Sequence, residues 1–253
     1  MGTTLLRVLI CGLVSVMLPS SWAQDSRPAW PPVLPPLVAQ TPDGWRVPQS
    51  GWRPVLPRDH GSHPDFALEW WYLTGHLWAK DGQRFGFQAT FFRKGLALPG
   101  TELTGLFGRD QVYLAHMALT DVSGRRFYQQ ERLNRAGWDA GATVGELAVH
   151  NGNWRLDWVP ETTEPTLHLQ GGVRAEAAFD LTLKAEKAAV SFGVDGVSRK
   201  GAANTAASHY LTFTRLQATG KVTLGGAELA VTGQAWMDHE ISSSQLDEDQ
   251  AGW

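Results

Sequence analysis

Hydrophobic and polar residues alternate over short stretches of this chain from Leu68 onward, and turn residues separate the stretches. Alternation with a period of two is typical of half-buried β-strands. No window keeps the spacing of an amphipathic helix, and 240–250 suits at most a short one. The pattern predicts strands over 68–79, 84–93, 111–121, 125–130, 143–150, 153–158, 166–170, 174–184, 188–193, 209–216, 218–224 and 227–238.

Many short antiparallel strands with frequent turns imply a sandwich or a barrel. We expect an all-β protein built as an antiparallel β-barrel. Closure of the sheet removes its exposed edges, and a barrel of this kind can hold one small ligand.

The first hairpin can be interpreted residue by residue. A two-residue turn at 81–82 would pair Trp70 with Arg93 on one face, while Glu69 and Trp71 point to the other. Both faces then carry large aromatic side chains, so we expect the barrel interior on one side and a partner layer on the other. Glu69 and Arg93 are interpreted as an ion pair across this hairpin rather than as catalytic groups.

Composition excludes several classes of protein. Among 253 residues the net charge is -3, so no basic surface for nucleic acid is expected. The single cysteine, Cys11, excludes a disulfide framework. The 12 tryptophans instead indicate large apolar surfaces with a polar N–H group, as pockets and interfaces use them.

The first residues are interpreted as an export signal. Residues 1–23 combine a basic residue, Arg7, with a short apolar run and the small-x-small site Ser21-Trp22-Ala23. The apolar run is too short to span a bilayer, so no transmembrane span should remain after cleavage. We therefore expect a periplasmic or secreted protein.

A proline-rich arm over 24–66 follows, with nine prolines between Pro28 and Pro57. Proline fixes φ and lacks an N–H donor, so the arm should be extended. It is either a spacer or an arm that packs Trp30, Trp45 or Trp52 on the barrel.

Several motifs resemble those of the carotenoid 1,2-hydratase / AttH-like family. They are 57–64 (PRDHGSHP), 69–77 (EWWYLTGHL), 85–88 (FGFQ), 91–93 (FFR), 236–240 (WMDHE) and the serines at 242–244. The resemblance implies a lipocalin-like barrel over 67–241 and apolar ligands. It also implies that 242–253 is the start of a second barrel, which the chain would lack.

The resemblance leaves the reaction open. The first hypothesis is a protein that binds an apolar isoprenoid or lipid-like ligand without chemistry. The second is a hydratase, a carbon–oxygen lyase that adds water across a terminal isoprenoid double bond. The third is an accessory factor of an ABC-type export system, with a transporter component as its partner.

The candidate catalytic residues are Asp238 and His239, with Asp238 as a proton donor. In a strand Asp238 and Glu240 point to one face and His239 to the other, so this triplet does not predict a metal site. We expect neither a metal nor a cofactor. Aromatic faces would stabilise a carbocation and histidines would orient water. The candidate ligand-binding residues are Trp70, Trp71, Tyr72, His76, His116 and Trp236.

Overall fold

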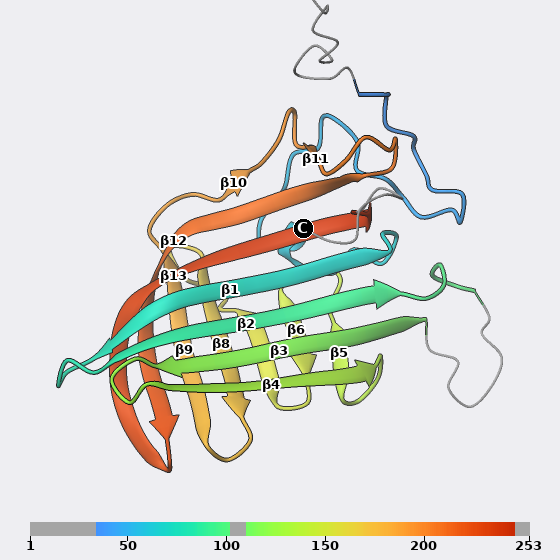
Figure 1. Ribbon diagram of the computed structural model, residues 1–253. Helices are drawn as coiled ribbons and strands as arrows, with labels where there is room; N and C mark the ends of the chain where they lie inside the picture. The colour runs from blue at the N-terminus through green and yellow to red at the C-terminus, as the bar shows by residue number, and fades with distance from the viewer. Residues whose placement is uncertain (1–33, 102–109, 246–253) are drawn as a thin grey trace, which may run out of the picture. The chain divides into compact units, whose positions relative to one another are not determined.

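The computed structural model describes residues 34–101 and 110–245, and these are nearly all β, as predicted (Figure 1). A 3-10 helix, η1 (Arg58–His60), precedes the strands. The first strands are β1 (Leu68–Ala79), β2 (Arg84–Gly95), β3 (Gln111–Asp121), β4 (Arg126–Arg135), β5 (Ala140–Ala142), β6 (Ala148–Asn151) and β7 (Trp154–Trp158). The others are β8 (Thr166–Val173), β9 (Ala177–Ala185), β10 (Val190–Ser191), β11 (Ser198–Arg199), β12 (Ala207–Leu224) and β13 (Ala227–Ser244).

The strands form one antiparallel sheet in the order β4-β3-β2-β1-β13-β12-β9-β8-β7-β6-β5, and β10 and β11 pair with β12. The long strands β12 and β13 bend, and Figure 1 shows them carrying the sheet from one layer to the other. A register shift between Phe213 and Leu216 marks one of two irregularities in the pairing of β12 with β13. The result is a nearly closed, lipocalin-like barrel.

Side chains join the two ends of the sheet. Arg132 on β4 donates to the carbonyl of Asn151 at 3.0 Å and to the Asn153 side chain at 2.7 Å. Asn134 donates to the side chain of Asn151 at 2.7 Å. The Arg132 guanidinium also lies 3.9 Å from the ring centroid of Trp154, a cation–π contact. These side-chain contacts close the barrel between the two ends of the sheet, whose end strands share no ladder of backbone hydrogen bonds among the described residues.

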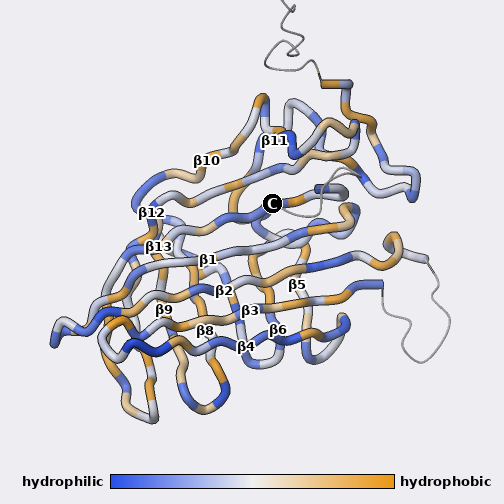
Figure 2. The backbone as a smooth tube through the Cα atoms, viewed as in Figure 1, coloured by the Kyte–Doolittle hydropathy of each residue, from blue (hydrophilic) through white to orange (hydrophobic). Residues whose placement is uncertain are grey.

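The interior is a continuous hydrophobic core. Alternate residues of the strands point inward, and Figure 2 shows apolar and polar positions mixed along most of them, with β4 largely hydrophilic. The largest fully buried side chains include Trp71, Phe85, Phe91, Trp154 and Phe213. Side chains therefore fill the space between the two layers.

The register predicted for the first hairpin is wrong by one residue. Trp70 pairs with Phe92, and Arg93 pairs with Glu69. The loop contains three residues rather than two, because the amide of Ala79 bonds to the carbonyl of Gln83 and Gly82 takes a positive φ of 85°. A type I turn followed by a left-handed glycine is the usual form of such a loop.

Other boundaries differ from the predictions in smaller ways. The predicted strand 143–150 overlaps only β6, which begins at Ala148, because β5 already ends at Ala142, and the segments 209–216 and 218–224 are one strand, β12. The segment 240–244 belongs to β13 rather than to a helix, so the strand continues three residues beyond 241. The predicted start of a second barrel falls mostly in 246–253, outside the described residues.

Residues of the proline-rich arm pack on the barrel. Trp45 is buried over Gly95, where a Cβ atom would overlap the indole ring. Trp52 stacks on His209 with ring centroids 4.2 Å apart. Of the two alternatives for the arm, packing on the barrel is therefore the one observed for Trp45 and Trp52. Trp30 and the predicted signal lie outside the described residues. Within the described part of the chain, no helix has the length and hydropathy of a membrane span.

Candidate functional site

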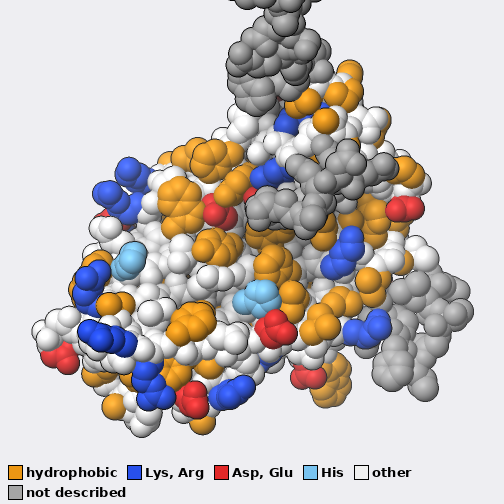
Figure 3. All heavy atoms as spheres, in the orientation of Figure 1, with side chains coloured by type: hydrophobic (Ala, Val, Ile, Leu, Met, Phe, Trp, Pro, Cys, Tyr) orange, Lys and Arg blue, Asp and Glu red, His pale blue; other side chains and the backbone are white. Residues whose placement is uncertain are grey.

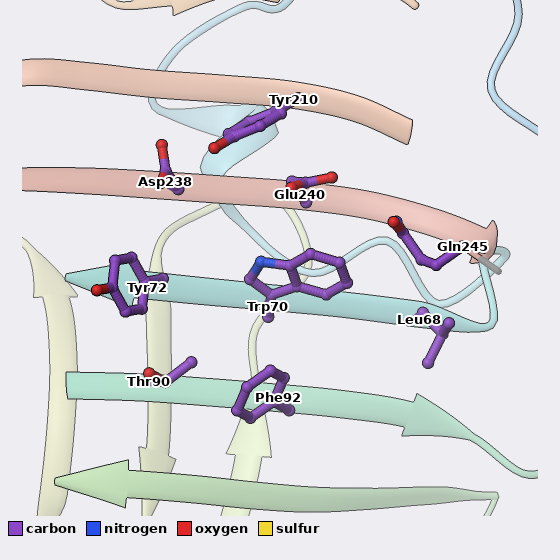
Figure 4. A pocket seen from close by; sticks show the side chains of 9 residues that line it. All are labelled: Leu68, Trp70, Tyr72, Thr90, Phe92, Tyr210, Asp238, Glu240 and Gln245. Carbon is purple, nitrogen blue, oxygen red and sulfur yellow. The ribbon is translucent and has the colours of Figure 1, made fainter. Parts of the chain in front are cut away.

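A groove of about 640 Å³ lies on the outer face of the barrel, across β12, β13, β1 and β2 (Figure 4). Its lining alternates with core residues such as Trp71, so these side chains point away from the interior. We call it the outer groove; it is lined by Leu68, Trp70, Tyr72, Thr90, Phe92, Tyr210, Asp238, Glu240 and Gln245. Apolar and aromatic side chains thus surround two carboxyl groups.

Asp238 is held in a fixed orientation. Its Oδ1 accepts a hydrogen bond from the Thr212 hydroxyl at 2.6 Å and another from the Trp236 indole at 2.7 Å. The Tyr210 hydroxyl bonds to the same carboxyl group. Burial and the neighbouring Asp238 raise the pKa of Tyr210, so its hydroxyl remains a proton-bearing donor. A carboxyl group fixed in this way can orient a ligand or water in the groove.

Glu240 forms the other charged part of the groove. It is 6% exposed, and its Oε2 lies 2.8 Å from Nζ of Lys200. The contact is an ion pair, and this oxygen has no hydrogen-bond partner among the described residues. The Lys200 ammonium also lies 4.6 Å from the ring centroid of Tyr210. Lys200 therefore balances the charge of Glu240. Asp238, the other carboxyl group of the groove, is held by hydrogen bonds from neutral side chains.

A second polar site, the buried cluster, lies on the inner side of the same strands and centres on Glu69. Oε1 of Glu69 lies 2.8 Å from Nδ1 of His63 and 2.9 Å from Nε2 of His239. Oε2 accepts a hydrogen bond from Nε of Arg93 at 3.0 Å. Burial disfavours the ionised carboxylate, yet the Arg93 charge and these hydrogen bonds hold the pKa of Glu69 well below its usual value. The expected ion pair between Glu69 and Arg93 is present.

A third imidazole, that of His60, extends the buried cluster. Because Nε2 of His239 donates to Glu69, its Nδ1 must accept, and Nδ1 of His60 lies 3.3 Å away as the donor. Nε2 of His60 is then an unprotonated nitrogen with no hydrogen-bond partner among the described residues. Burial lowers the pKa of His60 well below its usual value. Burial also lowers the pKa of His239, so both imidazoles are neutral at pH 7.

The buried cluster also contains the side chains with metal-ligand chemistry. His63, Glu69 and His239 bring their ligand atoms within 4.8 Å of one another. Both imidazoles bond to the same carboxylate oxygen, however, and Arg93 already supplies the opposite charge. A cation would have to displace these hydrogen bonds, so the geometry favours an ion-paired cluster over a metal site.

The structure separates the predicted site residues into three groups. Trp70, Tyr72 and Asp238 line the outer groove, and Trp236 bonds to Asp238 beside it. Trp71 and His239 lie inside the barrel and stack with ring centroids 4.9 Å apart.

The third group consists of the predicted histidines His76 and His116, which lie on the outer face, outside the lining of the groove. His116 meets the ring of Phe92 edge to face at 5.5 Å, and His76 lies exposed near Trp78.

Sequence reasoning missed several participants. His60 and His63 are not among the predicted site residues, yet His60 is fully buried and His63 is partly buried in the cluster around Glu69. The predicted pairing of Trp70 with Arg93 also implies that Phe92 points to the opposite face from Trp70, whereas the structure pairs Trp70 with Phe92. The correct three-residue turn would have placed Phe92 beside Trp70.

The fold and the outer groove define a lipocalin-like barrel with a candidate binding site on its outer face. The sequence model of the AttH-like family matches residues 47–253, and the chain belongs to this family. A search of curated proteins finds no match.

Two solved structures are similar. A crystal structure of an AttH-like protein from Nitrosomonas europaea shares 31% identity with a TM-score of 0.70 over 87% of this chain. Kievitone hydratase from Nectria haematococca shares 14% identity with a TM-score of 0.53 over 81% of this chain, which is a similarity of fold. The chain spans 62% and 57% of the lengths of these two structures.

Proposed function

We propose that this chain binds an apolar, isoprenoid or lipid-like ligand in the outer groove. The observation that carries this proposal is a groove of about 640 Å³ whose wall includes Trp70, Tyr72, Phe92 and Tyr210 on an outward face of the sheet. Aromatic side chains that are not covered by the core usually indicate binding of an apolar partner.

The polar groups of the groove would orient this ligand. Asp238 and Glu240 lie on β13 at one side, and Phe92 lies on β2 at the other. A ligand with one polar or reactive end would place that end near Asp238 and its apolar part over Trp70 and Phe92. This arrangement follows the usual design of ligand sites, in which a few polar groups set orientation within an apolar wall.

Titration with farnesol tests the proposal. Trp70→Ala should weaken the affinity at least about ten-fold, because a large aromatic contact is lost. Trp138→Ala is the matched control, since that side chain is 98% exposed and lies outside the groove, and it should leave the affinity unchanged. Equal affinities for the wild type and Trp70→Ala would contradict binding in this groove. Mass spectrometry of organic extracts from purified protein would identify a natural ligand.

Hydration of such a ligand is the second candidate function, and the position of Asp238 favours it. Asp238 would donate a proton to a carbon of a trisubstituted double bond, which leaves a tertiary carbocation. Trp70 and Tyr72 would stabilise that cation through their ring faces. Water would then add to the cation and lose a proton, which restores the acid. In this reaction the C=C bond gives one new C–H bond and one new C–O bond.

Export of the chain is a further part of the proposal. The signal-like composition of residues 1–23 supports a periplasmic or secreted location.

A further inference from the structure

The outer groove continues into a second groove, the distal groove, which has a volume of about 280 Å³. The two grooves share Leu68, Trp70 and Phe92. Beyond these residues the distal groove reaches Val112 and Leu114 on β3 and Leu133 on β4; the rest of its lining is Glu69, Arg93 and Lys94. The hydrophobic surface therefore extends away from Asp238 without interruption.

The strand register aligns these residues in a single row. Trp70 pairs with Phe92, Phe92 with Leu114, and Leu114 with Leu133. On the other side Trp70 pairs with Glu240, the neighbour of Tyr210 on β12. The row thus crosses the sheet from the polar end of the outer groove to β4. Figure 3 shows hydrophobic side chains gathered across this face, with charged groups around them.

Polar side chains border this row on one side. The next row toward Asp238 contains Tyr72, Thr90, His116 and Glu131, which are paired across the same strands. The row on the opposite side is mixed, and it alternates Leu68 and Val112 with Lys94 and Arg135.

The dimensions suit one extended chain. Rows on one face of a sheet are two residues apart, about 6.8 Å, whereas a helix with its side chains is about 10–12 Å wide. A helix would press its flanks against the polar border, but a hydrocarbon chain would fit. From β13 to β4 there are four strand spacings, which make about 19 Å at about 4.8 Å each.

We propose that Leu114 and Leu133 form a distal subsite that holds the tail of the ligand and selects for its length. The polar or reactive end lies beside Asp238, and the tail crosses Trp70 and Phe92 to reach β4. Leu133 is 68% exposed, so a tail covering it would remove apolar surface from water. This inference rests on the proposed function, because it says where the tail of the ligand proposed for the outer groove binds.

A series of prenyl alcohols of increasing length tests the inference. Isothermal titration measures the affinities for geraniol, farnesol and geranylgeraniol. Affinity should rise at least about five-fold with each added prenyl unit. Leu133→Ser should weaken geranylgeraniol binding about three-fold or more and leave geraniol binding within two-fold. Phe127→Ser is the matched control, since Phe127 lies on the same strand with 66% exposure but outside both grooves.

The outcomes separate the inference from the proposed function. Geraniol binding that depends on Trp70, with no gain for longer alcohols, would overturn the distal subsite and leave the outer groove as a binding site. Equal losses for all three alcohols in Leu133→Ser would also overturn it, because a general structural effect would explain them. Failure of all three alcohols to bind would overturn both proposals.

Discussion

The indole of Trp71 stacks on the imidazole of His239, with an interplanar angle of 19°, inside the barrel. The two residues pair directly across β1 and β13. Their neighbours Trp70 and Asp238 point to the opposite face and line the outer groove. The same two strands therefore build the groove on one side and the buried cluster on the other, and the alternation of the sheet keeps the two sites apart.

Trp71→Ala should lower the free energy of unfolding by about 3–5 kcal/mol, because loss of a large buried aromatic leaves a cavity. The side chain has no exposed surface, and its Nε1 donates to the carbonyl of His60 at 2.9 Å. Urea denaturation measures the change. Trp138→Ala should change stability by less than about 1 kcal/mol; a similarly small loss for Trp71→Ala would contradict its place in the core.

Glu69→Gln should also destabilise the protein by about 3–5 kcal/mol, since it leaves the Arg93 charge buried without its partner. Both side chains of this pair are fully buried. The control is Glu186→Gln, whose partner Arg215 lies 3.9 Å away in a largely exposed pair, and it should cost less than about 1 kcal/mol. Equal effects in the two variants would show that the buried cluster adds little to stability.

Acid should destabilise the protein below about pH 6.5. Burial lowers the pKa of His60 well below its ordinary value, lowers that of His239, and lowers that of His209 to about 4. The unfolded chain then binds protons first as the pH falls, so stability is fully present above about pH 6.5 and is lost toward the folded-state pKa values. Each histidine adds a slope of up to about 1.4 kcal/mol per pH unit.

Urea unfolding between about pH 7.5 and pH 5 measures this slope. His60→Gln should reduce it, whereas His76→Gln should not, because the side chain of His76 is exposed. An unchanged slope in His60→Gln would argue against a contribution from His60.

Asp238→Asn distinguishes catalysis from binding. An asparagine keeps the shape of the side chain but cannot deliver a proton, so hydration of a polyene should fall at least about 10²-fold. Ligand affinity should stay within a few-fold. If Asp238 is structural, stability should instead fall by about 1–3 kcal/mol, because an NH2 group would replace one of the two acceptor oxygens to which Thr212, Trp236 and Tyr210 bond. Tight binding of a polyene by the wild type without hydrated product would end the hydratase hypothesis.

Processing should leave Gln24 as the first residue of the exported protein, since cleavage is expected after Ala23. N-terminal sequencing of protein recovered from outside the cytoplasm measures this. Recovery of exported chains that begin with Met1 would contradict the interpretation of residues 1–23.

The alternation of apolar and polar residues was sufficient to locate most strands, including β1 and β3 at their observed bounds. The turn at 80–82 could not be assigned from its residues alone, because Asp81-Gly82 suits both two-residue and three-residue loops. The choice of a two-residue loop places Phe92 on the opposite face from Trp70, although the two residues pair in the structure.

The Glu69–Arg93 pair of the buried cluster could be predicted from the sequence, but the meeting of its histidines could not. His60 and His239 are 179 residues apart, and only the closed barrel brings them together. A histidine between prolines and glycines carries no local sign that it will be buried.

The position of β1 between β2 and β13 has a consequence for folding. Glu69 and His239 are separated by 170 residues, and β13 is the last strand of the described sheet. During synthesis β1 therefore has only β2 to pair with until β13 has been made, and its other edge stays open for the whole interval. Such long-range pairing slows folding and leaves edge strands free to aggregate. The nascent chain would accordingly benefit from a chaperone that covers β1 until β13 arrives.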